Sequence, residues 1–388
     1  TLNESQNAGN VAINIRGIGQ VRNGNPPVAV LYDGVLQISP NQFNQELFDI
    51  ERIEVLKGPQ GALYGRNAIG GAISIVAKQP TNEFEGQLRA GFGEGDEIKV
   101  GASISGPIVA DKALFRLSAS YRDFGGVIEN PTLRDEVDFY DETSVRGLLK
   151  LLPNDDLSID LRLAYSESSG GAVYWVNTPE GRANDNDGRP IGNIPGSNSR
   201  ELAEASVKLD WDLGGTTLTS ISAYNTVDEV FYGDLDFTPL NILDQFQDLE
   251  VSAFSQELRL TSPDDQRRRW IAGAYYLDTD RELTTVAFAD FGFFLGTPDG
   301  VLETPLLNTR DDFAIKTWAV FGQLDYDVTE RLTASFALRY DEEETDQTPL
   351  RPTRGITRAV TFDKVQPKFT LDYEFSDALL GYATYSEG

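Results

Sequence analysis

Residues 49–80 read DIERIEVLKGPQGALYGRNAIGGAISIVAKQP, and this stretch decides how the whole chain is interpreted. Five glycines lie between Gly58 and Gly71, and they separate two runs with β-branched residues, Arg52–Leu56 and Ala72–Ala77. Glycine at this density permits tight turns and close approach of one backbone segment to another. The stretch therefore predicts a compact, sharply turned β unit.

Three ordered blocks in the first 80 residues resemble the plug domain of TonB-dependent outer-membrane receptors. Ile50–Pro80 matches nearly every position of that family's plug signature, with Ala77 where Thr or Ser is commoner. INIRGIG (Ile13–Gly19) and VAVLYDGV (Val28–Val35) match two further plug segments in the expected order. The resemblance implies that residues 1–80 are the C-terminal part of an α+β plug domain, placed inside the lumen of a barrel.

Charge is distributed unevenly along the 388 residues. Residues 1–80 hold six basic and six acidic side chains, so the whole net charge of −28 lies in residues 81–388. Such an acidic surplus repels phosphate, and we do not expect nucleic acid as a partner. The surplus indicates an acidic solvated surface, with a cation-attracting surface as the alternative.

The absence of two residue types limits the chemistry. Without Cys and His, the chain has no disulfides, thiolate metal sites or Ser-His-Asp catalysis. The Asn184–Gly188 loop suggests a calcium-binding segment, but Ala183 and Ile194 would then stand where ligands are required. An ordinary polar loop is the better interpretation. We expect no enzyme activity, no cofactor and no metal site.

After Pro80, segments of about ten residues alternate between apolar and polar side chains. Residues 157–166 read LSIDLRLAYS, and residues 332–341 read LTASFALRYD. A period of two places the apolar residues on one face of a strand and the charged residues on the other. Strands are predicted at 84–92, 97–106, 113–123, 143–152, 157–168, 200–212, 216–227, 251–262, 269–280, 313–327, 331–342, 362–375 and 378–386.

A soluble β-sandwich would show similar alternation, so strand length and connections decide the class. A strand that crosses a bilayer needs about 9–11 residues, whereas soluble strands commonly have about 5–6. Tight turns such as Gly214–Gly215 alternate with long polar stretches near 124–142, 169–199, 228–250, 281–310 and 343–361. Aromatic residues near strand ends suit a membrane girdle: Tyr121, Tyr165, Tyr340, Tyr373 and Phe375. These features predict an antiparallel membrane β-barrel over residues 81–388.

The number of predicted strands indicates whether the barrel closes within this chain. Outer-membrane transporters with a plugged lumen have about 22 strands, and about 13 are predicted here. An open edge in lipid would leave backbone groups unpaired at several kcal/mol each. We therefore expect residues 81–388 to be the N-terminal part of a barrel that does not close within this chain.

Cations inside a barrel need partners. Glu257 lies on a predicted strand whose charged face should point inward. We expect Arg16 and Lys57 to pair with Glu257 and hold the plug in place. The resemblance supports this expectation, since both occupy the matching Arg-Gly and [Lys/Arg]-Gly-Pro positions. A purely structural role within the plug is the alternative.

Ligand contact is expected at the outward-facing end of the plug and in the long loops. Gln20–Asn25 and Asn41–Asn44 resemble the apical loops that touch ligand in the family. Arg22 could pair with an anionic chelate, and Phe43 could stack on it. The candidate contacts are Gln20, Arg22, Asn23, Gln42, Phe43, Tyr174, Trp175, Phe231 and Tyr232. Girdle or loop packing is the competing role of the aromatic residues.

The resemblance implies energy-coupled import across the outer membrane of a Gram-negative bacterium. A ferric siderophore is the expected cargo, TonB the expected energy-coupling partner, and outer-membrane lipid the surroundings. Import of a glycan, cobalamin or another nutrient is the near alternative. A passive porin fits less well, because it has no use for a plug.

Overall fold

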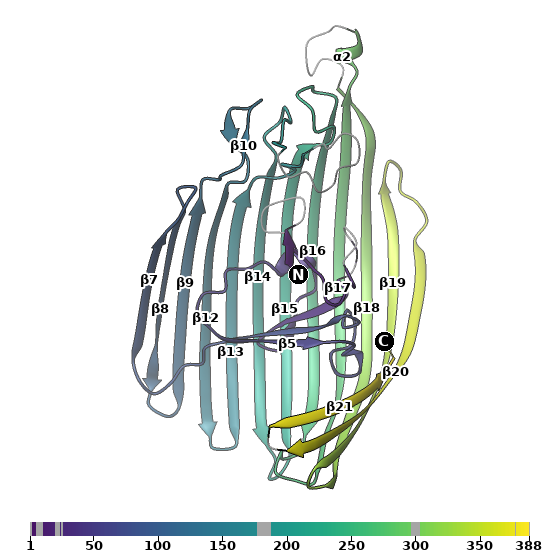
Figure 1. Cartoon of the computed structure of the whole chain (residues 1–388). Coiled ribbons are helices and arrows are strands. Elements are labelled where there is room, and N and C mark those ends of the chain that lie inside the picture. The colour runs from purple at the N-terminus through teal and green to yellow at the C-terminus, as the bar shows by residue number, and fades with distance from the viewer. Residues whose placement is uncertain are drawn as a thin grey trace.

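The computed structural model describes residues 2–4, 11–19, 24, 26–176, 188–295, 303–376 and 378–387. Strands dominate this part of the chain (Figure 1). Helix is confined, within the same ranges, to η1 (Pro40–Gln42), α1 (Gly61–Tyr64) and α2 (Gly292–Leu295). None of these helices has the length and hydropathy needed to cross a bilayer.

One antiparallel sheet contains thirteen strands, and its order follows the chain from β7 to β21. Its strands are β7 (Glu85–Phe92), β8 (Ile98–Val109), β9 (Ala113–Phe124), β12 (Tyr140–Asn154), β13 (Leu157–Gly170), β14 (Ser197–Asp212), β15 (Thr217–Asp234), β16 (Leu243–Thr261), β17 (Arg268–Asp290), β18 (Glu303–Thr329), β19 (Leu332–Arg351), β20 (Arg358–Ser376) and β21 (Leu379–Ser386). The prediction of about thirteen strands is confirmed. β7 and β21 form the two edges of the sheet.

The two faces of the sheet differ as the alternation predicted. On β15, Val227 is fully buried and packs with Leu202, Val251 and Ile38 on the concave side. The convex side exposes large apolar residues on many strands: Leu117, Leu163, Tyr224, Leu258, Val320, Phe336 and Phe369. A continuous apolar outer band is what a lipid-facing barrel surface requires.

The connections alternate between short and long. Tight turns join strands at 110–112, 155–156, 213–216, 262–267 and 330–331. The longer connections lie at the opposite end of the sheet, at the top of Figure 1, and one contains the short strands β10 (Glu129–Asn130) and β11 (Asp135–Glu136). The predicted asymmetry between the two ends is confirmed.

Several polar stretches predicted as loops are instead strand. β15 continues to Asp234 and β16 begins at Leu243, so most of residues 228–250 is paired. β18 extends over 27 residues and β19 reaches Arg351. The hydrogen-bonded ladder continues past the lipid-facing band, where the regular alternation of apolar and polar residues breaks down. Apolar alternation therefore ends before the strand does.

The N-terminal domain contains a four-stranded sheet in the order β4–β3–β6–β5. The strands are β3 (Val28–Tyr32), β4 (Val35–Leu36), β5 (Ile50–Lys57) and β6 (Gly71–Ala77), and β3 and β6 are parallel. A further pair, β1 (Leu2–Glu4) and β2 (Val11–Ile13), is antiparallel. A Cβ added at Gly71 would lie 2.2 Å from the Leu56 carbonyl oxygen, which is the close approach that the glycine spacing predicts.

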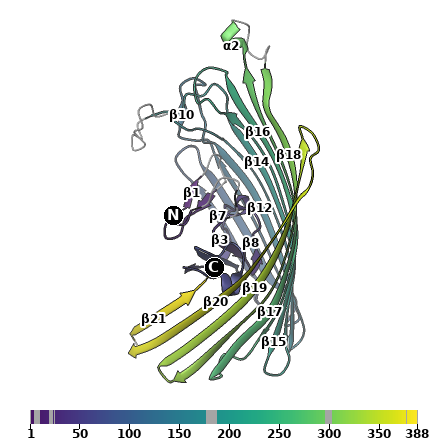
Figure 2. The same ribbon diagram turned by 90° about the vertical axis from the view of Figure 1, so that its right-hand side faces the viewer.

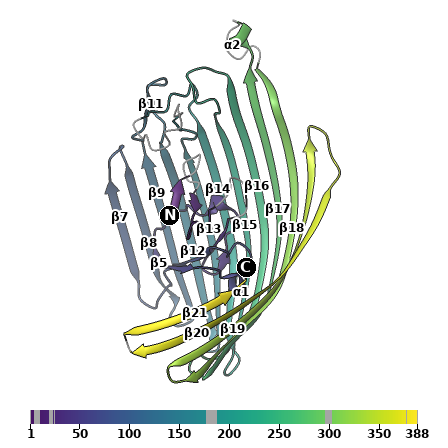
Figure 3. The same ribbon diagram turned by 45° about the vertical axis from the view of Figure 1, so that its right-hand side comes forward.

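The N-terminal domain has its own small apolar core and lies against the concave side of the large sheet. Ile13, Val28, Val30, Tyr32 and Ile75 form one buried cluster. Figures 2 and 3 show the domain within the curve of the thirteen strands. The predicted arrangement, a mixed N-terminal domain inside an antiparallel β wall, is confirmed.

Candidate functional site: the interface between the N-terminal domain and the inner wall

The concave face of the large sheet is called the inner wall below. The segment Tyr32–Asp49 meets this wall along β9 to β16, and the turn around α1 meets it along β18 to β20. Most of the hydrogen bonds between the two parts come from polar side chains in these two zones.

The most completely paired contact joins Asp49 to Arg116 on β9. Arg116 Nε donates to Asp49 Oδ2 at 2.6 Å, and Nη2 donates to Oδ1 at 2.5 Å. Both residues are buried, with 8% and 7% of their surface exposed. A two-pronged guanidinium–carboxylate pair fixes orientation as well as charge. Glu85 Oε2 lies 3.8 Å from Arg116 Nη1, and Lys78 Nζ lies 4.0 Å from Asp49 Oδ1, but these second partners are more distant. The short, buried Asp49–Arg116 pair therefore holds the domain against β9.

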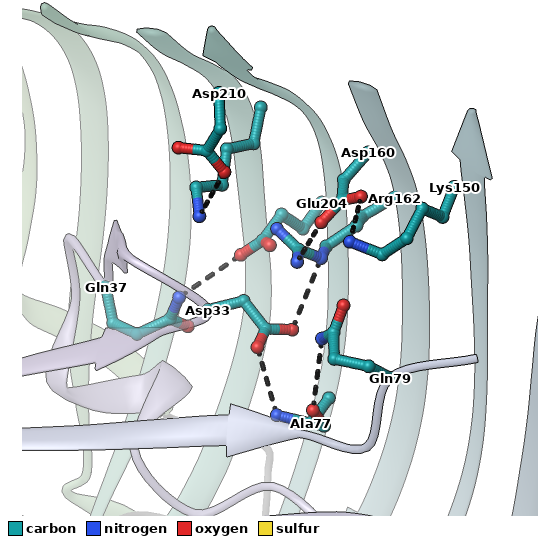
Figure 4. A network of polar contacts seen from close by, with 10 residues as sticks. Asp33, Gln37, Ala77, Gln79, Lys150, Asp160, Arg162, Glu204 and Asp210 are labelled. Carbon is teal, nitrogen blue, oxygen red and sulfur yellow. Dashed lines mark hydrogen bonds and ion pairs between the residues drawn. The ribbon is translucent and has the colours of Figure 1, made fainter. Parts of the chain in front are cut away.

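A second network begins at the turn between β3 and β4 (Figure 4). Asp33 Oδ2 lies 3.5 Å from Arg162 Nε on β13, and Asp33 Oδ1 accepts from the Ala77 backbone N–H at 3.0 Å. Arg162 also pairs with Asp160, which in turn contacts Lys150 at 2.8 Å. Burial raises the pKa of Asp33, and the positive charge of Arg162 opposes that rise.

Arg146 on β12 points at the N-terminal domain between these two contacts. Its guanidinium lies 4.0 Å from the ring centre of Tyr32, and Nη2 donates to Gln45 Oε1 at 2.8 Å. Nearby, Gln37 Nε2 donates to Glu204 Oε2 on β14 at 3.2 Å, as Figure 4 shows. The interface here consists of charged and amide groups rather than apolar packing.

The segment after η1 is fixed by backbone contacts. Arg200 on β14 donates to the carbonyl oxygens of Asn41 and Asn44 at 2.7 and 2.8 Å. The Asn41 amide donates to Glu229, and the Glu46 N–H donates to Glu142 at 3.2 Å. Burial, and then the nearby Glu142 carboxylate, raise the pKa of Glu46.

The turn around α1 makes the second zone. Arg66 Nη1 lies 3.3 Å from Glu343 Oε2 on β19, and Lys368 on β20 donates to Gln60 at 3.0 Å. Gly65 has φ +71°, and a Cβ there would lie 2.4 Å from Arg339 Nη2. Glycine at this position lets the signature turn approach the wall closely.

The predicted ion pairs of Arg16 and Lys57 with Glu257 are not brought together. Within the described ranges, Glu257 lies 3.3 Å from Arg259 on its own strand, while Arg16 and Lys57 are exposed and form no ion pair with it. Glu257 and Arg259 share one face of β16 two residues apart, so the wall neutralises Glu257 without the N-terminal domain. Asp33, Asp49 and Arg66 make the pairs to the wall instead.

The predicted apical contacts have other roles in this structure. Gln42 is 4% exposed, and its Oε1 accepts from the backbone N–H groups of Ile38 and Ser39 at 2.7 and 3.1 Å. Phe43 packs against the core of the N-terminal domain. Their contact with ligand stays a prediction. Gln20, Arg22 and Asn23 lie outside the described residues.

The predicted aromatic contacts of the wall divide into two groups. Phe231 is buried with Ala172 and Val173, and Phe237 packs against that cluster. Trp175 stacks on Phe237 with ring centres 5.9 Å apart, so Trp175 and Phe231 belong to one aromatic group. Tyr174, which is half-buried, precedes Trp175.

Tyr232 follows Phe231 on β15 and therefore points to the convex face, away from the lumen. Its hydroxyl donates to Asp244 at 3.1 Å. A lumenal ligand contact by Tyr232 does not fit this orientation.

Sequence reasoning missed the charged residues that join the two parts. Asp33 and Asp49 lie within the quoted plug segments, while Arg116, Arg146 and Arg162 lie on the charged faces of predicted strands. Their positions in the plug segments and on the charged strand faces were the signal that the sequence offered for these contacts. The position of each arginine along the barrel axis depends on strand register, and the alternation of apolar and polar residues does not specify that register.

No metal cluster is found in the described ranges: no three acidic side chains gather there with the geometry of a metal site. The loop residues Asn184 to Asp187 lie outside those ranges. The contacts described above are ion pairs, amide hydrogen bonds and arginine–aromatic contacts, and the apolar side chains Val35 and Ile38 also pack against the wall.

Two family models match this chain. The TonB-dependent receptor plug domain matches residues 1–72, and the TonB-dependent receptor-like β-barrel matches residues 115–388. The chain belongs to the TonB-dependent receptor family. From here on, its N-terminal domain is called the plug and its large sheet the barrel wall.

Among curated relatives, the pesticin receptor of Yersinia pestis is 35% identical over 156 residues, which cover 39% of this chain and 23% of the relative. The ferripyoverdine receptor of Pseudomonas aeruginosa is 30% identical over 157 residues, 39% of this chain and 17% of the relative. The matches thus span less than a quarter of either relative's length.

Two solved structures support the fold. The ferric yersiniabactin uptake receptor FyuA from Yersinia pestis superposes with a TM-score of 0.86 at 20% identity, covering 99% of this chain and 59% of that one. The siderophore receptor PiuA from Acinetobacter baumannii gives a TM-score of 0.78 at 15% identity, with coverage of 99% and 59%. At these identities the likeness establishes the architecture.

Proposed function

We propose that this chain is part of a receptor that imports a ferric siderophore across the outer membrane of a Gram-negative bacterium, with energy supplied through TonB. The observation that carries the proposal is a folded plug, attached to the inner wall by polar contacts, within a sheet whose outer face is apolar. A polar attachment suits a plug that must leave its seat, because water and the wall's own charges can replace it.

The names of the relatives support the choice of cargo. The proteins named above are described as receptors for ferripyoverdine and ferric yersiniabactin. A glycan, cobalamin or another nutrient imported by the same mechanism is the alternative. A passive porin is disfavoured because the plug occupies the lumen, and the family is one of transport receptors rather than enzymes.

The test is uptake of radioactive iron by a host that makes no siderophore and has lost its own siderophore receptors. The host expresses the full-length receptor and receives iron bound to pyoverdine, yersiniabactin or a catecholate. We expect one chelate to be accumulated in a TonB-containing host and not in an isogenic host without TonB. Equal accumulation in both hosts would refute energy coupling. Accumulation of none of the three, but growth on a glycan or cobalamin, would refute the siderophore assignment.

A second role, as the surface receptor of a protein toxin, is favoured by one observation. A relative at 35% identity is named as the pesticin receptor. Such a role would use the long connections at the upper end of the wall. Killing of receptor-expressing cells by purified pesticin, compared with cells without the receptor, tests it directly; survival of both would exclude this toxin.

A further inference from the structure

The inner wall from β9 to β14 differs in charge from the protein as a whole. Its inward-facing residues follow from the strand register, which brings Arg116, Leu148 and Arg162 into one row across β9, β12 and β13. This part of the wall carries seven cationic residues (Arg116, Arg122, Arg146, Lys150, Arg162, Arg200 and Lys208) and five anionic ones (Glu142, Asp160, Glu204, Asp210 and Asp212). It therefore has a net charge of +2 within a chain of net charge −28.

Three of these cations, Arg116, Arg146 and Arg162, are called the arginine track. Arg146 lies two residues from Leu148 on the same face of β12, so the three guanidinium groups come from adjacent strands. All three line one cavity between plug and wall, together with Tyr32 and Asp33 of the plug. The track is thus a row of three guanidinium groups directly beneath the plug, with the wall carboxylates Asp160 and Glu204 beside it.

The plug covers this surface with anionic and aromatic groups. Asp49 pairs with Arg116, Asp33 lies 3.5 Å from Arg162, and the Tyr32 ring lies 4.0 Å from the Arg146 guanidinium. Hydrogen-bonding capacity remains nevertheless. Among the described residues, Nη1 of Arg146 and both Nε and Nη1 of Arg162 are buried and donate no hydrogen bond. Buried donors of this kind favour an anionic occupant.

The neighbouring part of the wall has a different character. Val35 of the plug is buried against Ile221 and Ala223 on β15. Leu202, Val227 and Val251 form a second apolar cluster, with Ile38 of the plug packed on it. This apolar contact offers no group that would attract or orient a charged solute. The arginine track, unlike this apolar contact, is suited to anion passage.

We propose that the arginine track is an anion-binding path along the barrel wall, covered at rest by the plug carboxylates Asp33 and Asp49. When the plug moves, anionic groups of the cargo take the place of these carboxylates. The path suits chelates that bear carboxylate or phenolate groups, because a guanidinium pairs with such oxygens in a two-pronged geometry. This inference rests on the proposed import function and specifies the route and the charge of the cargo.

The experiment uses the absence of Cys from these 388 residues, and any Cys elsewhere in the full-length receptor is first replaced by Ser. Ser118 faces Arg146 across β9 and β12 and lines the same cavity, so Ser118→Cys places one thiol beside the track. Ser255→Cys, on the inward face of β16, is the reference position. The full-length receptor in detergent is treated with urea until the plug is released. Each thiol is then labelled with sulfonatoethyl methanethiosulfonate, which is anionic, or trimethylammonium-ethyl methanethiosulfonate, which is cationic.

We expect the anionic-to-cationic rate ratio at Ser118→Cys to exceed that at Ser255→Cys by about fivefold once the plug is released. Adding Arg146→Gln and Arg162→Gln should bring the ratio down to that of the reference position. Arg259→Gln, a wall cation outside the track, should leave it unchanged. Equal ratios at the two positions, or a ratio that the double substitution leaves intact, would overturn the proposal.

The ratio compares the rates of two reagents on one protein sample. If the whole protein lost its fold, the ratio would change at Ser255→Cys as well as at Ser118→Cys. The assay needs neither TonB nor cargo. A negative result therefore rejects the arginine track alone, whereas a failure of iron uptake rejects the proposed function alone.

Discussion

At the scale of single residues, Asp49 and Arg116 illustrate how the plug is attached. The two side chains are separated by 67 positions in the sequence, and both are buried where they meet. Removing one member of such a pair leaves an uncompensated buried charge, which costs more than the pair contributes. The consequences of substitution are therefore asymmetric.

Asp49→Asn should weaken plug attachment by less than the cost of a fully uncompensated buried charge, about 3–5 kcal/mol, because Arg116 loses its two-pronged partner but keeps Glu85 at 3.8 Å. The measurement is the urea concentration at which the plug becomes sensitive to protease. Arg52→Gln is the control, since Arg52 forms only solvent-exposed pairs with Glu51 and Glu54 and should change little. Similar urea midpoints for Asp49→Asn and the unaltered receptor would contradict the assigned role.

Glu46 should make plug attachment depend on pH. Its raised pKa means that the folded state favours the protonated carboxyl. The resulting stabilisation is complete below the usual pKa of 4.5 and is lost as pH rises through the raised value. We expect the urea midpoint for plug release to fall over that interval.

Glu46→Gln should remove this part of the pH dependence and stabilise attachment at neutral pH. The exposed Glu51→Gln serves as the matched control, because it alters net charge equally without facing Glu142. The same pH profile for Glu46→Gln and the unaltered receptor would show that another group is responsible.

At the scale of elements, the signature turn between β5 and β6 depends on backbone approach. Gly71 has φ +152°, and an added Cβ would meet the Leu56 carbonyl oxygen of the adjacent strand. Gly17 has φ +80°, but nothing lies within 4 Å of its added Cβ. Comparing substitutions at these two glycines therefore separates the effect of a positive φ from the effect of crowding by neighbouring atoms.

Gly71→Ala should destabilise the plug by about 1–3 kcal/mol more than Gly17→Ala, because only the former forces β5 and β6 apart. Both variants carry the strain of a left-handed backbone, about 1–2 kcal/mol. Protease sensitivity of the plug in urea again provides the measurement. Equal destabilisation by the two substitutions would mean that the turn tolerates the extra methyl group.

The number of strands in the wall was predicted correctly, but the lengths of several strands were underestimated. Alternation located each of the thirteen strands, including β15, which continues through polar residues to Asp234. Strand ends were misplaced because apolar periodicity reports contact with lipid, whereas a β ladder extends wherever neighbouring strands can pair.

At the scale of the whole molecule, the proposed import requires that the plug and the wall separate somewhere. Gln37 and Glu204 face each other across the polar side of the interface at 3.2 Å. Replacing both with Cys introduces the only two thiols in the chain, so a short bis-methanethiosulfonate reagent can join them through disulfide bonds that a reductant cleaves selectively.

The Gln37→Cys, Glu204→Cys double variant should lose iron uptake when cross-linked by this reagent and regain it after reduction. Each single-Cys variant should transport under both conditions and provides the control. Undiminished uptake by a demonstrably cross-linked receptor would place the moving part of the plug elsewhere and leave the Gln37 region seated during transport.

The sequence by itself determined the class of this protein, because the information is local. The glycine spacing from Gly58 to Gly71 specifies the turned plug unit, and a period of two specifies strands with an apolar face and a charged face. Only the tertiary structure decided which charges meet. Arg16, Lys57 and Glu257 were plausible partners by residue type, yet Glu257 is neutralised by Arg259 and the plug is held through Asp33 and Asp49. An ion pair requires two groups at the same height in the barrel, and that height is set by strand register and by the seat of the plug rather than by either residue's neighbours in sequence.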